Sequence, residues 1–150
     1  MKERLLISAC LTGRRCKYSG GDNYTPLVEK LRERYELVEV CPEVDGGLPI
    51  PRIPAERQGE RVVTREDVDV TAQYRRGAAL ALAAAREHGC TRAVLKERSP
   101  ACGFGLIYDG TFTKTLVPGA GVAAQLLSEN GVAVCGESAI PTLLATDNTD

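Results

Sequence analysis

Three cysteines each follow a short apolar stretch that reads as a buried β-strand. In chain order, the stretches and their cysteines are 5–7 with Cys10, 37–40 with Cys41, and 93–95 with Cys102. Thiolates bind zinc and iron–sulfur clusters and also act as nucleophiles. In an open parallel sheet, ligands bind outside the carboxyl ends of the strands. The three thiols are therefore expected to meet at that edge, although 31 and 61 residues separate them along the chain.

The other three cysteines are expected at different places on the same sheet. Cys16 lies in a basic, glycine-containing loop after the first strand, near the edge that holds the three thiols. Cys135 follows a strand over 132–134 and is placed further along that edge, whereas Cys90 precedes a strand and is placed at the opposite edge. The spacing lacks the dense Cys-x2-Cys pairs of most zinc and iron–sulfur signatures. For each cysteine, a role as a small buried apolar residue therefore stays open.

Turn-forming and polar residues surround the three thiols. The turn formers are Pro42, Pro100 and Gly103, and the polar neighbours are Ser8, Glu43 and Ser99. Glycine lets backbone N–H groups approach a ligand closely, and hydrogen bonds to cluster sulfurs tune such a centre. A serine or a carboxylate beside a metal centre can donate or accept a proton. Ser8, Glu43 and Ser99 could each serve in this way.

Strand and helix patterns alternate along the chain. Strands are expected at 4–9, 37–41, 61–63, 92–96 and 132–134, with a hairpin of 106–108 and 111–115 around the turn Asp109-Gly110. Helices are expected at about 26–34, from Asp69 or Thr71 to His88, at 119–129, and in a short segment after Ser138. This alternation predicts an α/β, single-domain, Rossmann-like three-layer fold with a mainly parallel sheet. The domain is expected to span 1–145, with a flexible tail at 146–150.

The composition is that of an ordinary globular protein. The 150 residues are 43% hydrophobic and 26% charged, and the net charge is -1, so nothing global favours nucleic acid or an acidic membrane. No apolar run approaches the ~20 residues of a membrane span, and no secretory signal is evident. A cytoplasmic location is expected, where six cysteines indicate metal binding or catalysis. The basic group at Arg14, Arg15 and Lys17 is expected to be a solvated loop, with contact to an anion or RNA as the alternative. His88 is expected to be a surface residue.

Several ordered motifs resemble those of the thiouracil desulfidases, a bacterial family. The motifs are Ser8-Ala9-Cys10-Leu11, Cys16-Lys17-Tyr18, Cys41-Pro42-Glu43, Gly46-Gly47-Leu48, Pro51 to Glu56, Ser99 to Gly103, and Ile107 to Phe112. The resemblance runs from about Leu5 to Leu143, which is nearly the whole chain.

The resemblance implies a cofactor and a reaction. It implies an oxygen-sensitive [4Fe–4S] cluster whose three protein ligands are Cys10, Cys41 and Cys102, with a fourth iron that has no protein ligand. The sulfur of a thiolated pyrimidine base or nucleoside would bind that iron, because sulfur is a soft donor and iron is a Lewis acid. Thiouracil would yield uracil and sulfide without net redox change. Glu43 matches the family's acidic residue and would be the general base.

The sequence departs from the family pattern beside the third cysteine. The family carries a serine immediately before it, and this chain has Ala101. Either Ser99 substitutes for that serine or the substrate differs, and a purely turn-forming Ser-Pro is the alternative role of Ser99. Arg52 and Glu56 are expected to pair and to hold the proline-rich loop after Cys41.

Two other functions remain open at this stage. The chain is a non-catalytic metal- or sulfur-binding module if Cys16 closes the site as a fourth ligand. It is a metal-free thiol enzyme if Cys10 or Cys102 is a nucleophile, although no histidine is suitably placed as the base. A small thiolated pyrimidine is favoured as substrate over transfer RNA, because one domain with balanced charge offers little phosphate-binding surface. The oligomeric state is not determined by the sequence.

Overall fold

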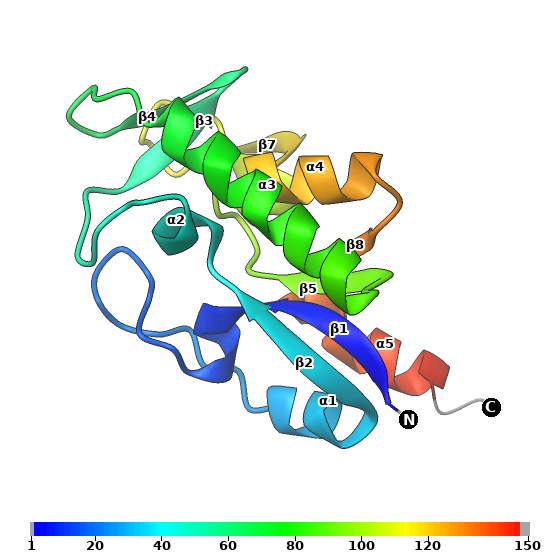
Figure 1. Ribbon diagram of the computed structural model, residues 1–150. Coiled ribbons are helices and arrows are strands. Elements are labelled where there is room, and N and C mark those ends of the chain that lie inside the picture. Colours follow the sequence, from blue (N-terminus) through cyan, green and yellow to red (C-terminus); the bar gives the residue numbers. More distant parts are fainter. Residues whose placement is uncertain (1, 148–150) are drawn as a thin grey trace.

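A parallel sheet forms the centre of the protein, seen here in a computed structural model that describes residues 2–147 (Figure 1). Its strand order is β2 (Tyr35–Val40), β1 (Glu3–Ser8), β5 (Arg92–Leu95) and β8 (Ala133–Gly136). All neighbouring pairs are parallel. From β1 the chain passes to β2 on one side and later to β5 on the other, so the strand order reverses at β1. Such a switch point opens a crevice at the carboxyl ends of the strands.

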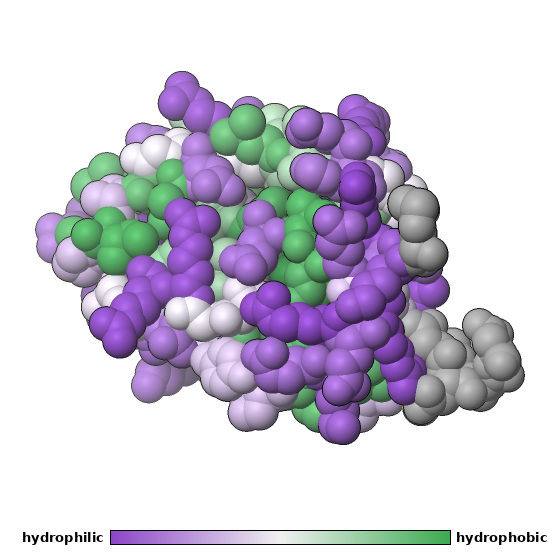
Figure 2. All heavy atoms as spheres, turned by 60° about the horizontal axis from the view of Figure 1, so that its bottom comes forward, coloured by the Kyte–Doolittle hydropathy of each residue, from purple (hydrophilic) through white to green (hydrophobic). Residues whose placement is uncertain are grey.

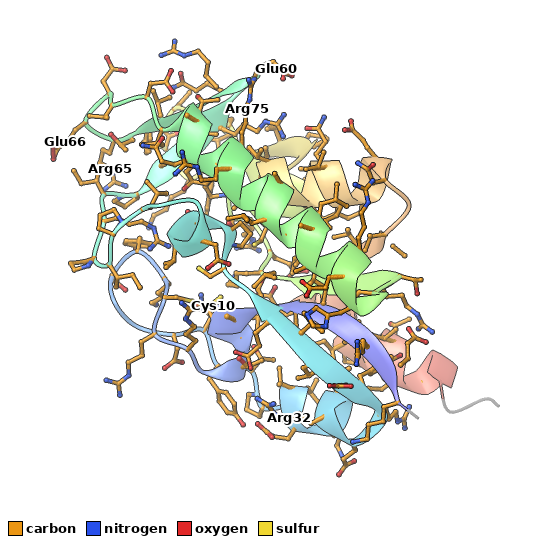
Figure 3. The ribbon with its side chains drawn as sticks, viewed as in Figure 1. Cys10, Arg32, Glu60, Arg65, Glu66 and Arg75 are labelled. Atoms are coloured by element: carbon orange, nitrogen blue, oxygen red, sulfur yellow. The ribbon has the colours of Figure 1, made fainter. Side chains whose placement is uncertain are left out.

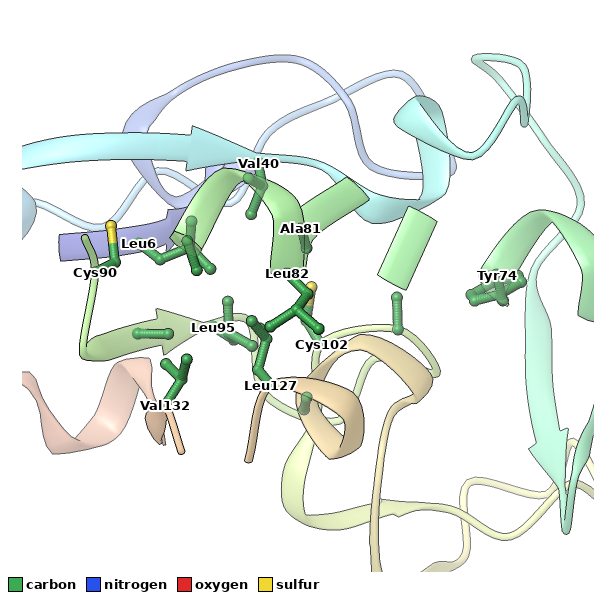
Figure 4. Close-up of a cluster of buried hydrophobic side chains, with 14 of the residues drawn as sticks. Leu6, Val40, Tyr74, Ala81, Leu82, Cys90, Leu95, Cys102, Leu127 and Val132 are labelled. Atoms are coloured by element: carbon green, nitrogen blue, oxygen red, sulfur yellow. The ribbon is translucent and has the colours of Figure 1, made fainter. Parts of the chain in front are cut away.

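Helices cover both faces of the sheet. One face carries α1 (Val28–Arg34) and α5 (Ile140–Asp147), and the other carries α3 (Thr71–His88) and α4 (Val122–Glu129) (Figure 1). Successive residues of β1 point to opposite faces: Leu5 and Ile7 join the cluster with α1 and α5, and Leu6 joins the cluster with α3 and α4 (Figure 4). Full burial of such side chains stabilises the fold by about 1.5–3 kcal/mol each. The expected three-layer α/β fold is confirmed.

Two antiparallel hairpins stand beside the carboxyl edge of the sheet. They are β3 (Ala55–Gln58) with β4 (Arg61–Thr64), and β6 (Phe104–Tyr108) with β7 (Leu116–Ala120). Gln58 Nε2 donates to the Gly110 carbonyl at 2.9 Å, and Arg57 Nη1 donates to the Ala120 carbonyl at 2.7 Å. These hydrogen bonds join the hairpins into one wall. The sequence patterns predicted β4 but missed β3.

The second hairpin differs from the expected tight turn at Asp109-Gly110. The returning strand is Leu116–Ala120 rather than 111–115, and a loop over 109–115 connects the strands. Glu56 Oε1 accepts hydrogen bonds from the backbone N–H groups of Gly110 and Phe112, which draws the loop toward β3 and away from a two-residue turn. Because β7 extends to Ala120, α4 begins at Val122 rather than at 119.

Short helical turns occupy segments that were expected to be loops. A 3-10 turn at Ala9–Thr12 follows β1, α2 (Pro42–Asp45) follows β2, and a 3-10 turn at Glu137–Ala139 precedes α5. The final helix extends to Asp147, and the residues of the expected tail at 148–150 lie outside the described range. No helix within residues 2–147 is long and apolar enough to cross a membrane.

The face turned forward in Figure 2 is largely hydrophilic. Hydrophobic side chains emerge there in several separate areas and not as one continuous patch (Figure 2). This pattern is ordinary for a folded domain, because scattered apolar surface is normal. The scattered apolar side chains on this face therefore do not mark a functional site.

Candidate functional site

Cys10, Cys41 and Cys102 meet at the carboxyl edge of three adjacent strands. Cys10 lies just beyond β1 (Figure 3), Cys41 directly follows β2, and Cys102 lies in the turns after β5. All three are buried, and all three line one pocket of about 750 Å³. Cys16, which is 1% exposed, lines the same pocket. The sheet thus brings together thiols that are far apart in the sequence.

Local backbone structure holds each of the three thiols. The 3-10 turn that carries Cys10 ends at Gly13, whose φ of 107° is a left-handed conformation that suits glycine. Cys41 caps α2, and its N–H donates to Asp45 Oδ2 at 3.1 Å. The N–H of Cys102 donates to Ser99 Oγ at 3.1 Å. Each thiol therefore has a fixed starting position at its strand end.

The thiols differ in acidity because their surroundings differ. Burial raises the pKa of both Cys10 and Cys102. A hydrogen bond from the Cys16 side chain lowers the pKa of Cys41 to about 7, and the same bond raises the pKa of Cys16. Cys41 Sγ also lies 3.9 Å from the Cys16 carbonyl oxygen. Cys41 is therefore the thiol that ionises first, and a bound cation would be needed to hold the others as thiolates.

The pocket offers soft sulfur donors with space beside them. Within the described range, no three His, Cys, Asp or Glu side chains converge as the ligands of one metal ion would. Thiolates that bind different irons of one cluster stand further apart than the ligands of one ion. The pocket also has room beside the thiols, since it measures about 750 Å³. The donor set of thiols and the space beside them both fit an iron–sulfur cluster.

The carboxylate of Glu43 is held from two sides at the pocket wall. Arg52 Nη2 donates to its Oε1 at 3.1 Å, and the Tyr74 hydroxyl donates to its Oε2. The Glu43 side chain is 20% exposed, whereas that of Arg52 is 6% exposed. Arg52 Nη2 also donates to the Cys16 carbonyl at 2.9 Å. A fixed carboxylate two residues from Cys41 therefore faces the pocket.

Ser99 lines the pocket, and Ala101 does not. Ser99 Oγ accepts the N–H groups of Ala101 and Cys102 at 3.0 and 3.1 Å, so it shapes the turn and still has its own proton to donate. Ala101 is 0% exposed and belongs to the apolar core. Gly121 packs on it so closely that a Cβ at Gly121 would stand 2.4 Å from the Ala101 carbonyl carbon. Two pocket-lining hydroxyls thus stand beside Cys102: that of Ser8, which hydrogen bonds to its side chain, and that of Ser99, which accepts its backbone N–H.

The expected pair of Arg52 and Glu56 is wrong. Arg52 turns toward Glu43, and Glu56 accepts the N–H groups of Gly110 and Phe112 from the second hairpin. The physical reason is satisfaction of buried groups: Glu56 is 8% exposed, and two backbone donors need an acceptor there. Arg52 therefore serves the pocket, while Glu56 ties the hairpins together.

Three residues at the site were not found from the sequence. Asn23 hydrogen bonds to Cys10, Lys96 lines the pocket beside it, and Tyr74 reaches Glu43 from α3. Lys96 Nζ is held by Glu137 Oε2 at 2.9 Å. None of the three lies in a motif with a recognisable spacing. Their proximity to the thiols depends on the tertiary structure alone.

Basic and strained residues line the outer part of the pocket. The basic residues there are Lys17, Arg65, Arg98 and Lys114. Arg98, Phe112 and Lys114 have φ values of 68°, 60° and 60°, and among the non-glycine residues described only Asp67 shares this conformation. A left-handed conformation costs an ordinary residue of order 1–3 kcal/mol, and such strain is concentrated at functional sites. Three of the four described non-glycine residues with this conformation therefore lie at this pocket.

The remaining cysteines and the histidine lie away from the pocket lining. Cys90 follows the end of α3 and lies at the amino edge of the sheet. Cys135 is inside β8, opposite Val94, rather than beyond the end of the strand. His88 is the last residue of α3 and is partly buried. These positions leave the pocket with the four thiols described above.

The fold and the site define an α/β enzyme with a thiol-lined pocket at its strand switch point. The 2-thiouracil desulfurase family model matches residues 5–139, and the chain belongs to this family. It is 39% identical to the uncharacterized protein YbbK of Bacillus subtilis (strain 168), over 93% of this chain and 99% of that protein. The predicted family membership is thereby confirmed.

A solved structure is similar over the whole chain. It is that of the [4Fe-4S]-dependent thiouracil desulfidase TudS, which is 42% identical in sequence and superposes with a TM-score of 0.92. The match covers 99% of this chain and 100% of that one. The likeness extends to the whole architecture, both hairpins included.

Proposed function

We propose that this enzyme binds a [4Fe–4S] cluster through Cys10, Cys41 and Cys102 and removes sulfur from a thiolated pyrimidine. The observation that carries the proposal is the meeting of these three buried thiols in one pocket with the Glu43 carboxylate. The similarity to a [4Fe-4S]-dependent thiouracil desulfidase supports both the cofactor and the substrate class. The family supports the reaction.

The reaction exchanges the thione sulfur of the substrate for a water oxygen. When bound, the cluster supplies an iron without a protein ligand as a Lewis acid for that sulfur. Glu43 accepts a proton from the attacking water, whose oxygen becomes the carbonyl oxygen of the product. The sulfur leaves as sulfide, and no electron is gained or lost overall. The proton held by Glu43 then leaves with the sulfide, while the Ser99 hydroxyl, whose oxygen accepts two backbone N–H groups, orients the substrate by donating a hydrogen bond.

The outer wall of the pocket bears on the substrate class. Four basic side chains line it, and Phe112 offers an aromatic ring beneath Arg65, whose guanidinium carbon is 5.7 Å from the ring centroid. A free base would leave these cations without a partner from the ligand, whereas a nucleoside phosphate would place its anion among them. The proposal therefore extends from a thiolated base or nucleoside to the corresponding nucleotide, and a transfer RNA is not required.

A closed metal site with Cys16 is the second candidate function. The observation in its favour is the contact between the Cys16 and Cys41 side chains at the pocket wall. If Cys16 were a ligand, no iron would be free for the substrate. The enzyme would then be a metal- or sulfur-binding module, and it would desulfurate nothing.

Anaerobic reconstitution tests the proposal. The chain is purified without oxygen, loaded with iron and sulfide, and analysed for iron and acid-labile sulfide. We expect about four of each per chain, as for a [4Fe–4S] cluster. Loss of thione absorbance and release of sulfide are then followed with 2-thiouracil, 4-thiouridine and thiouridine 5′-monophosphate. A loaded protein that leaves all three unchanged would favour the closed site.

A further inference from the structure

We propose that Tyr74 is a positioning residue for the reaction: its buried hydroxyl, together with Arg52, fixes the carboxylate of Glu43. The inference rests on the proposed function, in which Glu43 accepts a proton from water. Tyr74 lies on α3 and outside the thiol-lined pocket, and it acts through Glu43 alone.

The two donors reach the carboxylate from different parts of the fold. The Tyr74 hydroxyl donates to Oε2 from α3, and Arg52 Nη2 donates to Oε1 at 3.1 Å from the loop before β3. A carboxylate offers about four acceptor positions, two on each oxygen. One donor on each oxygen fixes both the direction and the plane of the group. The Glu43 side chain is 20% exposed and lines the pocket, so its carboxylate still has acceptor positions to offer there.

Burial makes Tyr74 a dependable donor. The residue is 1% exposed, and its ring belongs to the main apolar core. Burial, followed by the nearby Glu43 charge, raises the pKa of Tyr74 well above its ordinary value. The hydroxyl therefore keeps its proton across the working range of an enzyme. A rotation away from Glu43 would leave a buried hydroxyl without an acceptor.

Close contact between two helices sets the distance between Tyr74 and Glu43. A Cβ at Gly77 would lie 1.8 Å from the Pro42 carbonyl oxygen, and one at Gly46 would lie 2.0 Å from the Gln73 carbonyl oxygen. The backbones of α2 and α3 therefore touch on both sides of the hydrogen bond. This contact ties the segment of Cys41 and Glu43 to a long helix, which is the kind of rigid support that a catalytic group needs.

A merely structural hydrogen bond would behave differently from a positioning one. Removal of a merely structural bond lowers stability, and any loss of kcat that it causes is independent of the loss caused by Glu43→Gln. Removal of a positioning bond lowers kcat only while Glu43 is present, because the two side chains act as a unit. The pair Tyr74→Phe and Glu43→Gln therefore separates the two roles.

The experiment uses the cluster-loaded enzyme and four forms: wild type, Tyr74→Phe, Glu43→Gln and the double variant. We expect Tyr74→Phe to lower kcat by about 10–100-fold, since small misplacement of a reacting group costs up to about 10²-fold. KM and the iron content should change by less than about twofold, as the pocket lining is untouched. The double variant should be no slower than Glu43→Gln alone.

Two further measurements make the outcome decisive. In the cluster-free chain, the loss of melting temperature in the double variant should be smaller than the sum of the two single losses. Tyr35→Phe is the matched control, because Tyr35 is buried at 3% exposure and its hydroxyl accepts from Arg92 Nη1 at 3.2 Å, at the amino edge. It should lower stability and leave kcat unchanged.

Three outcomes would overturn the proposal. They are an unchanged kcat in Tyr74→Phe, a double variant whose kcat loss is the product of the two single losses, and additive losses of melting temperature in the cluster-free chain. If the wild type desulfurates nothing, the proposed function fails. The cluster-free melting temperatures then still decide whether Tyr74 holds Glu43.

Discussion

Both edges of the central sheet carry buried cysteines, but those at the carboxyl edge line a pocket and Cys90 at the amino edge does not. At the carboxyl edge, Cys10, Cys16, Cys41 and Cys102 line one pocket. At the amino edge, Cys90 is 6% exposed and packs in the same apolar core as Cys102, from the opposite end (Figure 4). Burial raises the pKa of Cys90 as it raises those of Cys10 and Cys102, so the two edges differ in access to the pocket and not in this effect. The position of a cysteine relative to the strand direction therefore decides its chemistry.

The difference between the edges follows from the connections. At the carboxyl edge, the chain leaves β1 and β5 by long loops that spread apart and leave room for a pocket. At the amino edge, Gly89 ends α3 with a φ of 68°, and the chain enters β5 three residues later at Arg92. A connection this short leaves no space for a ligand. Cys90 consequently fills the core as a small apolar side chain.

Removal of one thiol from each edge should give the largest contrast. Cys10→Ala, Cys41→Ala and Cys102→Ala should each lose the cluster and reduce desulfuration to the uncatalysed background, because each removes one of three ligands. Cys90→Ala should keep the iron content and the activity, and it should lose about 1 kcal/mol of stability or less. Iron analysis measures the cluster content, and the loss of thione absorbance measures the desulfuration activity. Full activity in Cys41→Ala would end the three-ligand proposal.

A Cβ added to a glycine should also separate the two edges. Gly77→Ala places a methyl group 1.8 Å from the Pro42 carbonyl oxygen, so α2 must move. We expect a loss of about 2–3 kcal/mol, as for overpacked cores, together with a large drop in activity. Gly131→Ala, before β8, meets open space and carries only the strain of its φ of 89°, about 1–2 kcal/mol. Urea unfolding compares the two, and an unaffected Gly77→Ala would contradict the helix contact.

The turn around Cys102 allows a finer test within the carboxyl edge. Ser99→Ala removes the acceptor of two N–H groups and a hydroxyl in the pocket, so we expect about 1–2 kcal/mol less stability and a kcat at least about 10-fold lower. Ala101→Ser is the control, since its hydroxyl would lie in the apolar core and affect stability alone. Steady-state kinetics of the two variants at equal iron content tests this difference in kcat. If adding Ala101→Ser to Ser99→Ala restored kcat, the catalytic hydroxyl would be assigned to position 101 instead.

The smallest effect is expected for the fourth thiol of the pocket. Cys16→Ala removes a hydrogen bond to Cys41 and returns the pKa of Cys41 toward its ordinary value. Cluster iron and kcat should stay within about twofold of the wild type, because Cys16 is not one of the proposed ligands. Iron content is measured after reconstitution at pH 7. Loss of the cluster would instead support the closed four-thiol site.

The position of the proposed ligands was predictable because strand ends can be found in a sequence. Apolar runs mark the buried strands, and parallel strands share a carboxyl edge, so Cys10, Cys41 and Cys102 were expected to be neighbours. The opposite location of Cys90 followed from the same rule. The family motifs added Glu43 as the proposed general base only through resemblance, since spacing alone does not single out that carboxylate.

The surroundings of the site were not predictable in the same way. Tyr74 contacts Glu43 because Gly77 lets α3 touch α2. A glycine within an alanine-rich helix pattern does not indicate which segment will pack against it. The expected pair of Arg52 and Glu56 failed because the partners of both residues come from other segments. The return strand of the second hairpin was misplaced because Glu56, far away in sequence, holds the loop open. Hydrogen bonds between segments far apart in the sequence determine all three of these features.

The order of the strands has a consequence for biosynthesis. Cys10 and Cys41 leave the ribosome early, but the segment with Cys102 follows 61 residues later, roughly 3–12 s at about 5–20 residues per second. Until then β1 has β2 on one side and nothing on the other, because its second neighbour is β5. A nascent chain therefore presents two thiols and no pocket. With Cys102 as a proposed ligand, the cluster is therefore expected to bind only after β5 has paired with β1 and the three thiols are in place.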